Sequence, residues 1–132
     1  MFDWRRPAHL REGAAARDGR LAPCKRTPNC VSSQADPADA GHYIAPLAFP
    51  GTVGELRRAI ERLPRVSVVR EETDYLYAEF RTPLLRYVDD VEFQKAGDVV
   101  HVRSASRLGR RDFGVNRRRI EEIRRLLAAL RR

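Results

Sequence analysis

The chain has 132 residues, of which 42% are hydrophobic and 33% are charged. This composition excludes an intrinsically disordered chain and leaves room for one domain with a single core. No apolar run approaches the length needed to cross a membrane, and the opening MFDWRRPAHLREG lacks the apolar stretch of a secretory signal, so we expect a cytoplasmic protein.

The net charge of +8 is concentrated at the C-terminal end of the chain. Residues 103–132 contain eleven arginines and three acidic residues, whereas residues 1–102 contain equal numbers of basic and acidic side chains. A one-sided charge of this kind is found on surfaces that bind polyanions. It is also typical of the solvated face of a surface helix, and we favour this second interpretation.

The first half of the chain predicts an arm, a loop and a helix. Residues 1–20 are polar and form a separate N-terminal arm, whereas residues 21–132 form the single domain. Residues 21–51 contain five prolines and predict a loop packed against that domain. The sequence TVGELRRAIERLP then predicts a helix, because Thr52 and Glu55 have the spacing of a capping box and a proline ends the pattern.

Two hairpins and a final helix follow. Apolar and polar residues alternate within residues 66–82 and again within residues 86–106, as in strands with one buried face. Asn116 is a suitable N-cap for the last helix. The inner stripe of that helix is expected to hold Ile120, Ile123, Leu127 and Leu130. The predicted fold class is α+β with two layers: a four-stranded antiparallel sheet, two helices packed on one face, and the order α-β-β-β-β-α. The other face of the sheet is expected to be partly open.

The second hairpin is expected to turn at residues 95–98, which sets the register of its two strands. With the turn centred on this segment, Asp90 lies opposite Arg103 and Glu92 lies opposite His101. We therefore predict two contacts between acidic and basic residues on one face. Valine and phenylalanine side chains fill the opposite, apolar face.

Asp89 has the parity of the apolar residues and is predicted to point toward the helices, opposite Ser104. A buried carboxylate needs hydrogen-bond donors. The donors expected nearby are Ser104, Ser106, Arg107 and the amides at the start of the last helix. Part of the arginine-rich segment would then serve to satisfy a buried acid.

The last helix carries three consecutive arginines at residues 117–119 in its first turn. The helix dipole disfavours a cation there by about 0.3–1 kcal/mol when the cation is exposed. Either acids such as Asp89 and Asp112 offset this cost, or an external anion binds at the helix start. We favour the first explanation and keep the second as the basis of a binding site.

Several stretches resemble a known family. LAPCKRTPNCVSSQ contains a Pro-Asn-Cys-Val-Ser-Ser element, YVDDVEF contains an Asp-Asp-x-Glu strand, and HVRSASRLGRRDFGVNRRRIEEIR contains an Arg-Ser-x-Ser-Arg-x-Gly…Asp-x-Gly-x-Asn-Arg block. Together they resemble the domain of unknown function 1499 family of bacterial and plastid proteins over roughly residues 20–130. The resemblance implies a family and no activity. The motif positions are Pro28–Ser33, Asp89, Asp90, Glu92 and Arg103–Arg117.

Cys24 and Cys30 flank the turn-forming triplet at residues 27–29, which would bring them within disulfide range. In a reducing cytoplasm we favour free, packed thiols, with a disulfide as the alternative. A reactive Cys30 with His101 as its base is less favoured. No metal or other cofactor is predicted, because His42 and His101 lack the paired spacing of a zinc site.

The function we favour is a non-enzymatic binding or interaction domain. Its candidate ligand is a small anion held by amides and guanidinium groups at the start of the last helix. The candidate binding residues are Asn29, Ser32, Ser33, Asp89, Arg103, Ser104, Ser106, Arg107, Asp112, Asn116 and Arg117. The sequence leaves any other partner and the oligomeric state open.

Two other classes of function remain as alternatives. The first is an enzyme that uses Cys30 or the acidic strand with Asp89, Asp90 and Glu92. The second is a protein that binds nucleic acid or another polyanion through its arginine-rich C-terminal face, with aromatic side chains of the open sheet face for base stacking. That open face would present Tyr75, Tyr77, Arg81, His101 and Arg103.

Overall fold

The computed structural model describes residues 6–11, 16–17, 19–84, 87–109 and 112–131. Within these residues, no helix has both the length and the apolar composition needed to cross a membrane. The elements, in chain order, are α1 (Ala8–Arg11), β1 (Ala16–Arg17), β2 (Arg20–Leu21), β3 (Cys30–Ser32), β4 (Leu47–Ala48), α2 (Val53–Ile60), β5 (Val66–Glu71), β6 (Tyr75–Arg81), β7 (Val88–Ala96), β8 (Val99–Ser106) and α3 (Val115–Leu130). The predicted α+β class with an antiparallel sheet is confirmed.

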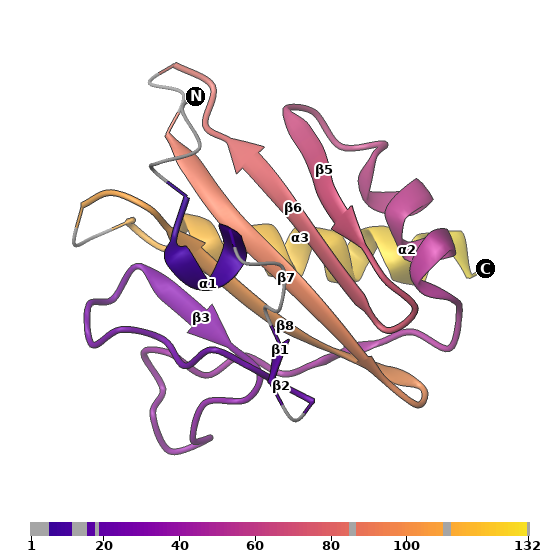
Figure 1. Ribbon diagram of the computed structural model, residues 1–132, viewed down its shortest axis with the longest axis horizontal. Coiled ribbons are helices and arrows are strands. Elements are labelled where there is room, and N and C mark those ends of the chain that lie inside the picture. The colour runs from indigo at the N-terminus through magenta and orange to yellow at the C-terminus, as the bar shows by residue number, and fades with distance from the viewer. Residues whose placement is uncertain (1–5, 12–15, 18, 85–86, 110–111, 132) are drawn as a thin grey trace.

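A six-stranded antiparallel sheet forms the centre of the domain (Figure 1). Its strands run in the order β3-β8-β7-β6-β5, and β4 pairs with β8 as well. The prediction of four strands is wrong because the proline-rich segment contributes two more. β3 pairs with residues 103–105 of β8, and β4 pairs with residues 99–100. Strands this short have no sequence signal of their own, since their pairing with the long β8 defines them.

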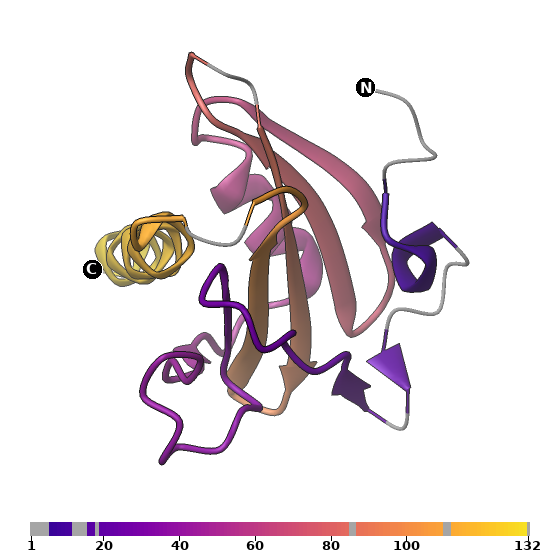
Figure 2. The same cartoon turned by 90° about the vertical axis from the view of Figure 1, so that its left-hand side faces the viewer.

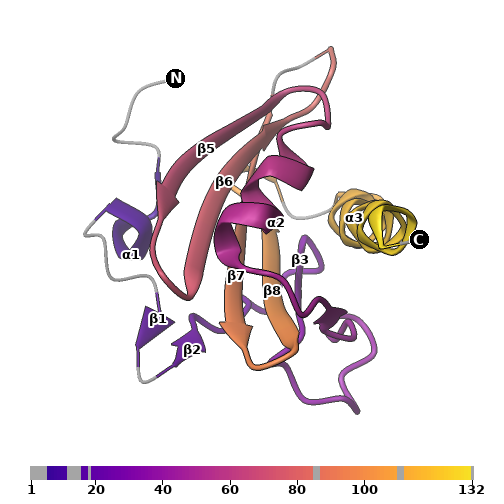
Figure 3. The same cartoon turned by 90° about the vertical axis from the view of Figure 1, so that its right-hand side faces the viewer.

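α2 and α3 pack on the same face of the sheet (Figures 2 and 3). The apolar core between these layers includes Ile44, Leu47, Leu56, Ile60, Leu76, Phe80, Val91, Phe93, Val102, Ile120, Ile123 and Leu127. The opposite face was expected to be partly open. It is instead covered by α1 and the small β1–β2 sheet, which lie on the other side in Figure 3.

α2 begins as predicted. The backbone N–H of Glu55 donates to Thr52 Oγ1 at 3.1 Å, and the backbone N–H of Thr52 donates to Glu55 Oε1 at 3.0 Å, which completes the capping box. Leu56 and Ile60 lie on the buried side of the helix. The helix therefore starts from a local sequence signal and is held in place by its apolar stripe.

α3 begins at Val115, so the prediction that Asn116 is its N-cap is wrong. Gly114 takes that position with φ at 79°, a left-handed conformation that favours glycine. Asn116 lies instead in the first turn and is fully buried. The predicted inner stripe is confirmed except for Leu130, which lies in the last turn and is 45% exposed.

The turn between β7 and β8 lies one residue later than predicted. Ala96 pairs with Val99, so the turn consists of Gly97 and Asp98, with Gly97 at φ 63°. Glycine adopts this positive φ without strain, which explains why Gly97 rather than Ala96 takes the first position of the turn. The shift changes each cross-strand partner by two positions but leaves every side chain on its predicted face.

The cross-strand partners differ from the predicted ones for this reason. The observed pairs are Asp89–Ser106, Asp90–Ala105, Glu92–Arg103 and Gln94–His101. The predicted pairs Asp90–Arg103, Glu92–His101 and Asp89–Ser104 are therefore wrong. Asp90, Glu92 and Arg103 still share one face of the sheet, as expected from their alternation.

Candidate functional site

The face of the sheet that points away from α2 and α3 carries a buried group of charged and aromatic side chains, which we call the charged face. It consists of Tyr75, Tyr77 and Glu79 from β6, Asp90 and Glu92 from β7, Arg103 from β8, and Arg107 just after β8. These side chains share one side because they are alternate residues of paired strands. All of them are buried, and Glu92 is 0% exposed.

Arg107 joins two of the three carboxylates on the charged face. Its Nε donates to Asp90 Oδ2 at 2.9 Å, a terminal nitrogen donates to Asp90 Oδ1 at 2.8 Å, and the same nitrogen pairs with Glu79. Burial would lower the pKa of Arg107, but these contacts raise it, so the guanidinium stays charged. Burial would raise the pKa of Glu79, but hydrogen bonds from Arg6 and Arg107 hold that pKa below its usual value.

The two tyrosines also donate to carboxylates of β7. Tyr75 donates to Glu92 Oε2 at 2.7 Å, and Tyr77 donates to Asp90 Oδ1 at 2.5 Å. Burial and the neighbouring carboxylates raise the pKa of both phenols, so both remain neutral donors. Arg103 lies 3.7 Å from Glu92, and burial lowers its pKa against the opposing effect of that carboxylate. The arrangement is suited to binding by charge and hydrogen bonding.

A second polar cluster surrounds the start of α3, with Asn116 at its centre. Ser104 donates to Asn116 Oδ1 at 2.6 Å, and Asn116 Nδ2 donates to Ser106 Oγ at 2.9 Å and to the backbone oxygen of Asn29 at 3.3 Å. Asp112 accepts from the side chain and the backbone of Asn116 at 2.7 and 3.1 Å. Burial would raise the pKa of Asp112, but these hydrogen bonds lower it. The cluster ties β3 and β8 to α3.

Asp89 points toward the helices, as predicted. Arg119 donates to Asp89 Oδ2 at 2.5 Å, and its guanidinium lies 5.0 Å from the ring centroid of Phe80. The donor is thus an arginine of α3 rather than one of the residues expected from β8 and its following loop. Together with Asp112, Asp89 offsets part of the positive charge in the first turn of α3.

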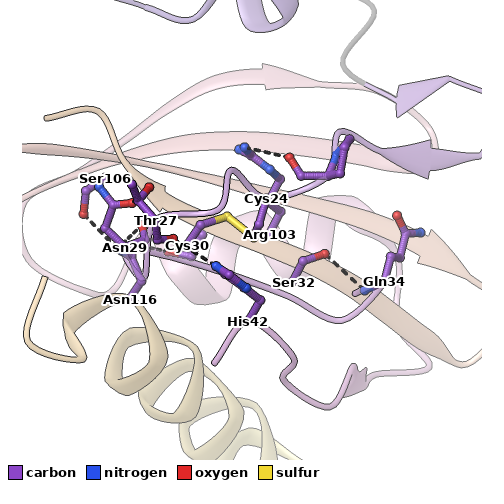
Figure 4. The surroundings of a disulfide bond; sticks show 12 residues. Cys24, Thr27, Asn29, Cys30, Ser32, Gln34, His42, Arg103, Ser106 and Asn116 are labelled. Atoms are coloured by element: carbon purple, nitrogen blue, oxygen red, sulfur yellow. Dashed lines mark hydrogen bonds between the residues drawn. A yellow bond between two sulfur atoms is a disulfide. The ribbon is translucent and has the colours of Figure 1, made fainter. Parts of the chain in front are cut away.

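Cys24 and Cys30 form a disulfide, so the expectation of free thiols is wrong (Figure 4). The turn between them brings the two Cα atoms to 5.7 Å, which is within the range that a disulfide requires. A bonded Cys30 has no thiolate to act as a nucleophile. His101 was proposed as its base, but its Nδ1 lies 2.9 Å from Ser33 Oγ and forms a hydrogen bond with it.

The structure divides the predicted binding residues into separate groups. Five of them lie in the cluster around Asn116: Asn29, Ser104, Ser106, Asp112 and Asn116. Arg103 and Arg107 lie on the charged face, and Asp89 pairs with Arg119 on the helix side. Ser32 and Ser33 lie at the end of β3, where the backbone N–H of Gln34 donates to Ser32 Oγ and that of Val102 to Ser33 Oγ. Arg117 donates to the backbone oxygen of Ala40 at 3.1 Å.

Sequence reasoning missed two parts of this arrangement. It assigned the tyrosines of β6 to an open surface and did not include Glu79 with the acids of β7. The alternation of Tyr75, Tyr77 and Glu79 with apolar residues was the available signal, because strand pairing places such residues beside Asp90 and Glu92. Residues 6–11 also contact this face, through Arg6 and Glu79, and no comparable signal in the sequence predicts that contact.

Two surface hollows lie beside the first turn of α3. The first, which we call the arginine groove, has a volume of about 750 Å³ and lies between α3 and the ends of β5 and β6. Its charged lining residues are Arg65, Arg81, Arg117, Arg118, Arg119, Arg125, Glu121 and Glu122. The second is an apolar pocket of about 640 Å³, and its lining includes Leu108, Phe113 and the carboxylate residue Asp89. Among the described residues, no group of three His, Cys, Asp or Glu side chains is placed to hold a metal ion.

Comparison with known proteins bears on the family. No curated protein and no solved structure matches this chain. Residues 20–127 match the family model described as "Protein of unknown function (DUF1499)", which confirms the resemblance seen in the motifs. The matched region includes the six-stranded sheet, α2 and most of α3. The chain therefore belongs to the DUF1499 family of proteins of unknown function.

Proposed function

We propose that this domain is a non-enzymatic binding domain that holds a small anionic ligand, such as a phosphate or a carboxylate, in the arginine groove. The site remains beside the start of α3 and extends along the helix to Arg125, but the proposed contacts are arginines that reach solvent. Arg65, Arg118 and Arg125 are exposed and line the same groove. In the described part of the chain, none of the three forms an ion pair with a carboxylate. That observation carries the proposal.

The electrostatics of the groove favour an anion. Three guanidinium groups around one hollow repel each other, and their attraction to an anion between them offsets that repulsion. Guanidinium groups also make two-point hydrogen bonds to phosphate and carboxylate oxygens. Of the two glutamates in the groove, Glu121 accepts from Arg124 at 2.8 Å and so is already engaged. The positive end of the α3 dipole adds to the same field.

Binding is favoured over catalysis by the state of the candidate catalytic residues. Cys30 is in a disulfide, and the carboxylates of Asp89, Asp90 and Glu92 accept hydrogen bonds from an arginine or a tyrosine. A polyanion would use the same arginines without a shaped site. Nucleic-acid stacking on the sheet is disfavoured because Tyr75 and Tyr77 are buried.

The cytoplasmic location expected from the sequence stays a prediction. The disulfide between Cys24 and Cys30 weighs against it, because cytosolic thiols are kept reduced. Alkylation of thiols in intact cells, followed by mass spectrometry of the peptide with both cysteines, distinguishes the two states. An alkylated peptide would support the cytoplasm, and an unmodified, disulfide-linked peptide would favour an oxidising compartment.

Thermal unfolding in the presence of phosphate, sulfate or a dicarboxylate tests the proposed function. A ligand at about a hundred times its Kd stabilises the folded state by about 2.7 kcal/mol, which raises the Tm of a small domain by several degrees. We expect such a shift from one of these anions, and we expect it to persist at high salt. A shift that appears only with oligonucleotides and disappears with salt would replace this proposal with polyanion binding.

Two variants localise the effect. Arg125→Gln removes an exposed guanidinium from the groove and should abolish most of the anion-dependent shift. Arg26→Gln is the matched control, because Arg26 is exposed but does not line the groove. Both variants lose one positive charge, so a general charge effect would reduce the anion-dependent shift in Tm equally in both. Equal shifts in the two variants would contradict a site in the arginine groove.

A further inference from the structure

The charged face is covered in part by a segment that lies outside the family match, whereas Leu21 of β2, which also packs there, lies within it. The seven residues of the charged face all fall within residues 20–127, the matched region. The segment that lies over it consists of residues 6–11, which we call the arm and which includes α1. Figure 2 shows α1 on the side of the sheet opposite α3. The family domain thus carries a face of buried charges, and part of the cover of this face lies outside the matched region.

The arm contacts this face through a guanidinium, an imidazole and an apolar side chain. Arg6 donates through Nε and a terminal nitrogen to Glu79 Oε2 at 2.9 and 2.7 Å, and its guanidinium lies 5.7 Å from the Tyr77 ring centroid. His9 Nε2 lies 3.7 Å from Glu92 Oε1. Leu10 is buried against the two tyrosines of β6. Carboxylates beside tyrosine rings are suited to recognising arginine.

Charge explains why a basic segment lies there. Within the matched region, the charged face has three carboxylates, those of Glu79, Asp90 and Glu92, and two guanidinium groups, those of Arg103 and Arg107. The face itself therefore holds one more carboxylate than buried guanidinium groups. At its edge the partly exposed Arg81 lies 3.5 Å from Glu79, and Arg6 provides a closer partner at 2.7 Å. A segment that replaces the arm is favoured if it supplies a cation at the same point, because each close positive charge stabilises a buried carboxylate.

The arm satisfies this face incompletely. Six buried side-chain polar atoms have no hydrogen-bond partner in the described part of the chain, and five of them belong to the arm, to β7, to β8 or to the residue just after β8. These five are His9 Nε2, Glu92 Oε1, Gln94 Oε1, Arg103 Nε and Arg107 NH1. Glu92 is 0% exposed, and its Oε1 lies 3.7 Å from both His9 Nε2 and Arg103, which is too far for a hydrogen bond with either. Such atoms carry a desolvation cost that a better-matched occupant removes.

We propose that the charged face is a binding site for an arginine-bearing basic segment of a partner protein, and that the arm occupies this site as an intramolecular competitor. The partner places its arginine at Glu79 and over the Tyr77 ring, where Arg6 lies in the free protein. It also donates to Glu92 Oε1. Binding displaces the arm, which is held by one helical turn and few side chains. This site lies across the sheet from the arginine groove and does not depend on the anion proposed there.

A peptide with the sequence of residues 5–11, RRPAHLR, tests this inference as a ligand added to the full-length protein. The arm reduces the apparent affinity of any competitor by the fraction of time that the site is free. A variant with Arg6→Ser and Leu10→Ser loosens the arm without changing the charged face. We expect this variant to bind the peptide at least about tenfold more tightly than the unaltered protein does. Isothermal titration gives the affinities, and amide shifts in β6 and β7 give the location.

A peptide in which glutamine replaces the second arginine is the matched control. It leaves the protein unchanged, so its result does not depend on the folding of a variant. We expect the control peptide to lose binding, since it cannot supply the cation at Glu79. Equal binding of the two peptides would overturn the proposal, as would no binding to an arm variant that unfolds cooperatively. Equal affinities for the unaltered protein and the arm variant would also overturn it.

The variant Arg125→Gln separates this inference from the proposed function. It removes a guanidinium from the arginine groove, which lies on the helix side of the sheet. We expect the arm variant to bind the peptide with the same affinity whether or not it also carries Arg125→Gln. A loss of peptide binding in the combined variant would place the peptide in the groove and would overturn the assignment to the charged face. If Arg125→Gln removes the anion-dependent rise in Tm and leaves peptide binding unchanged, the result bears only on the arginine groove.

Discussion

On the face of the sheet that α2 and α3 cover, aliphatic and aromatic side chains meet other apolar side chains. On the face that the arm covers, three carboxylates and two buried arginines form pairs among themselves and with Arg6. Both faces are built from the same strands, through alternate residues. They differ in what their cover has to supply. The cover of an apolar face has to bury apolar area with a complementary shape. The cover of a charged face has to place a group of defined charge at a defined position.

This difference determines how each face responds to damage. Removing part of an apolar side chain costs free energy in proportion to the area and cavity involved, so the loss is graded. Removing one member of a buried ion pair leaves the other charge without a partner, so the loss is large and sudden. Single substitutions on the charged face should therefore lower the free energy of unfolding clearly more than single substitutions on the apolar face.

The largest effect is expected for Arg107→Met. The substitution leaves Asp90 and Glu79 without the guanidinium that joins them, at a buried position. We expect the free energy of unfolding to fall by about 3–5 kcal/mol, the range for breaking a buried ion pair. Urea unfolding followed by circular dichroism measures it.

Arg81→Met is the control for this prediction. Arg81 lies 3.5 Å from the same Glu79 but its side chain is 31% exposed, so water can replace the interaction. A loss of no more than about 1 kcal/mol is expected for such a pair. If Arg107→Met were as mild as Arg81→Met, the charged face would owe little of its stability to ion pairing.

The next largest effect is expected from reduction of the disulfide. Cys30 is the first residue of β3 and pairs with Ala105 of β8, and Pro23, next to Cys24, accepts a hydrogen bond from Arg103 of the charged face; Figure 4 shows the disulfide and Arg103. Closing a loop of this short length restricts the unfolded chain and stabilises the folded state by about 2 kcal/mol in the chain-entropy model. Urea unfolding with and without a reductant measures the loss. An unchanged midpoint after verified reduction would show that the bond does not stabilise this edge.

A smaller, graded effect is expected for Ile123→Val on the apolar face. Ile123 is 0% exposed and belongs to the core between α3 and the sheet. Loss of one methyl group should reduce the free energy of unfolding by about 0.5–1.5 kcal/mol. The same urea experiment gives the value. A loss comparable to that of Arg107→Met would remove the proposed distinction between the two faces.

The features that could be predicted from the sequence are those that depend on neighbouring residues. The capping box of α2 and the face on which Asp89 lies follow from spacing within a few positions. The stripe of α3 follows from helical periodicity for the same reason. The turn of the second hairpin was misplaced by one residue because several turn-forming residues are adjacent there, and the left-handed φ of Gly97 decides between them.

The features that could not be predicted depend on contacts between distant segments. β3 and β4 exist because β8 extends along them, and the charged face is buried because residues 6–11 lie over it. The disulfide was disfavoured by an argument about the cellular compartment, although the turn geometry permitted it. Four of the five candidate residues around Asn116 were found together because they belong to one motif, whereas Asn29 comes from a second motif that the fold brings beside them.

The smallest effect concerns the pH dependence of Asp112→Asn at the start of α3. Burial opposes ionisation of Asp112, but its hydrogen bonds with Asn116 and the backbone prevail and lower its pKa in the folded protein. A group with a depressed pKa contributes stability above its unfolded pKa of about 4, and this contribution is lost as the pH falls through the folded value. Because an asparagine oxygen can still accept from the backbone N–H of Gly114 or Asn116, the variant should lose less than about 1 kcal/mol at pH 7. Its stability should then fall less steeply than that of the unaltered protein between about pH 5 and 3, as measured by urea midpoints, since it lacks this titrating group. Parallel curves would mean that acid sensitivity comes from other carboxylates, with Glu79 of the charged face as the first to test because its pKa is lowered as well.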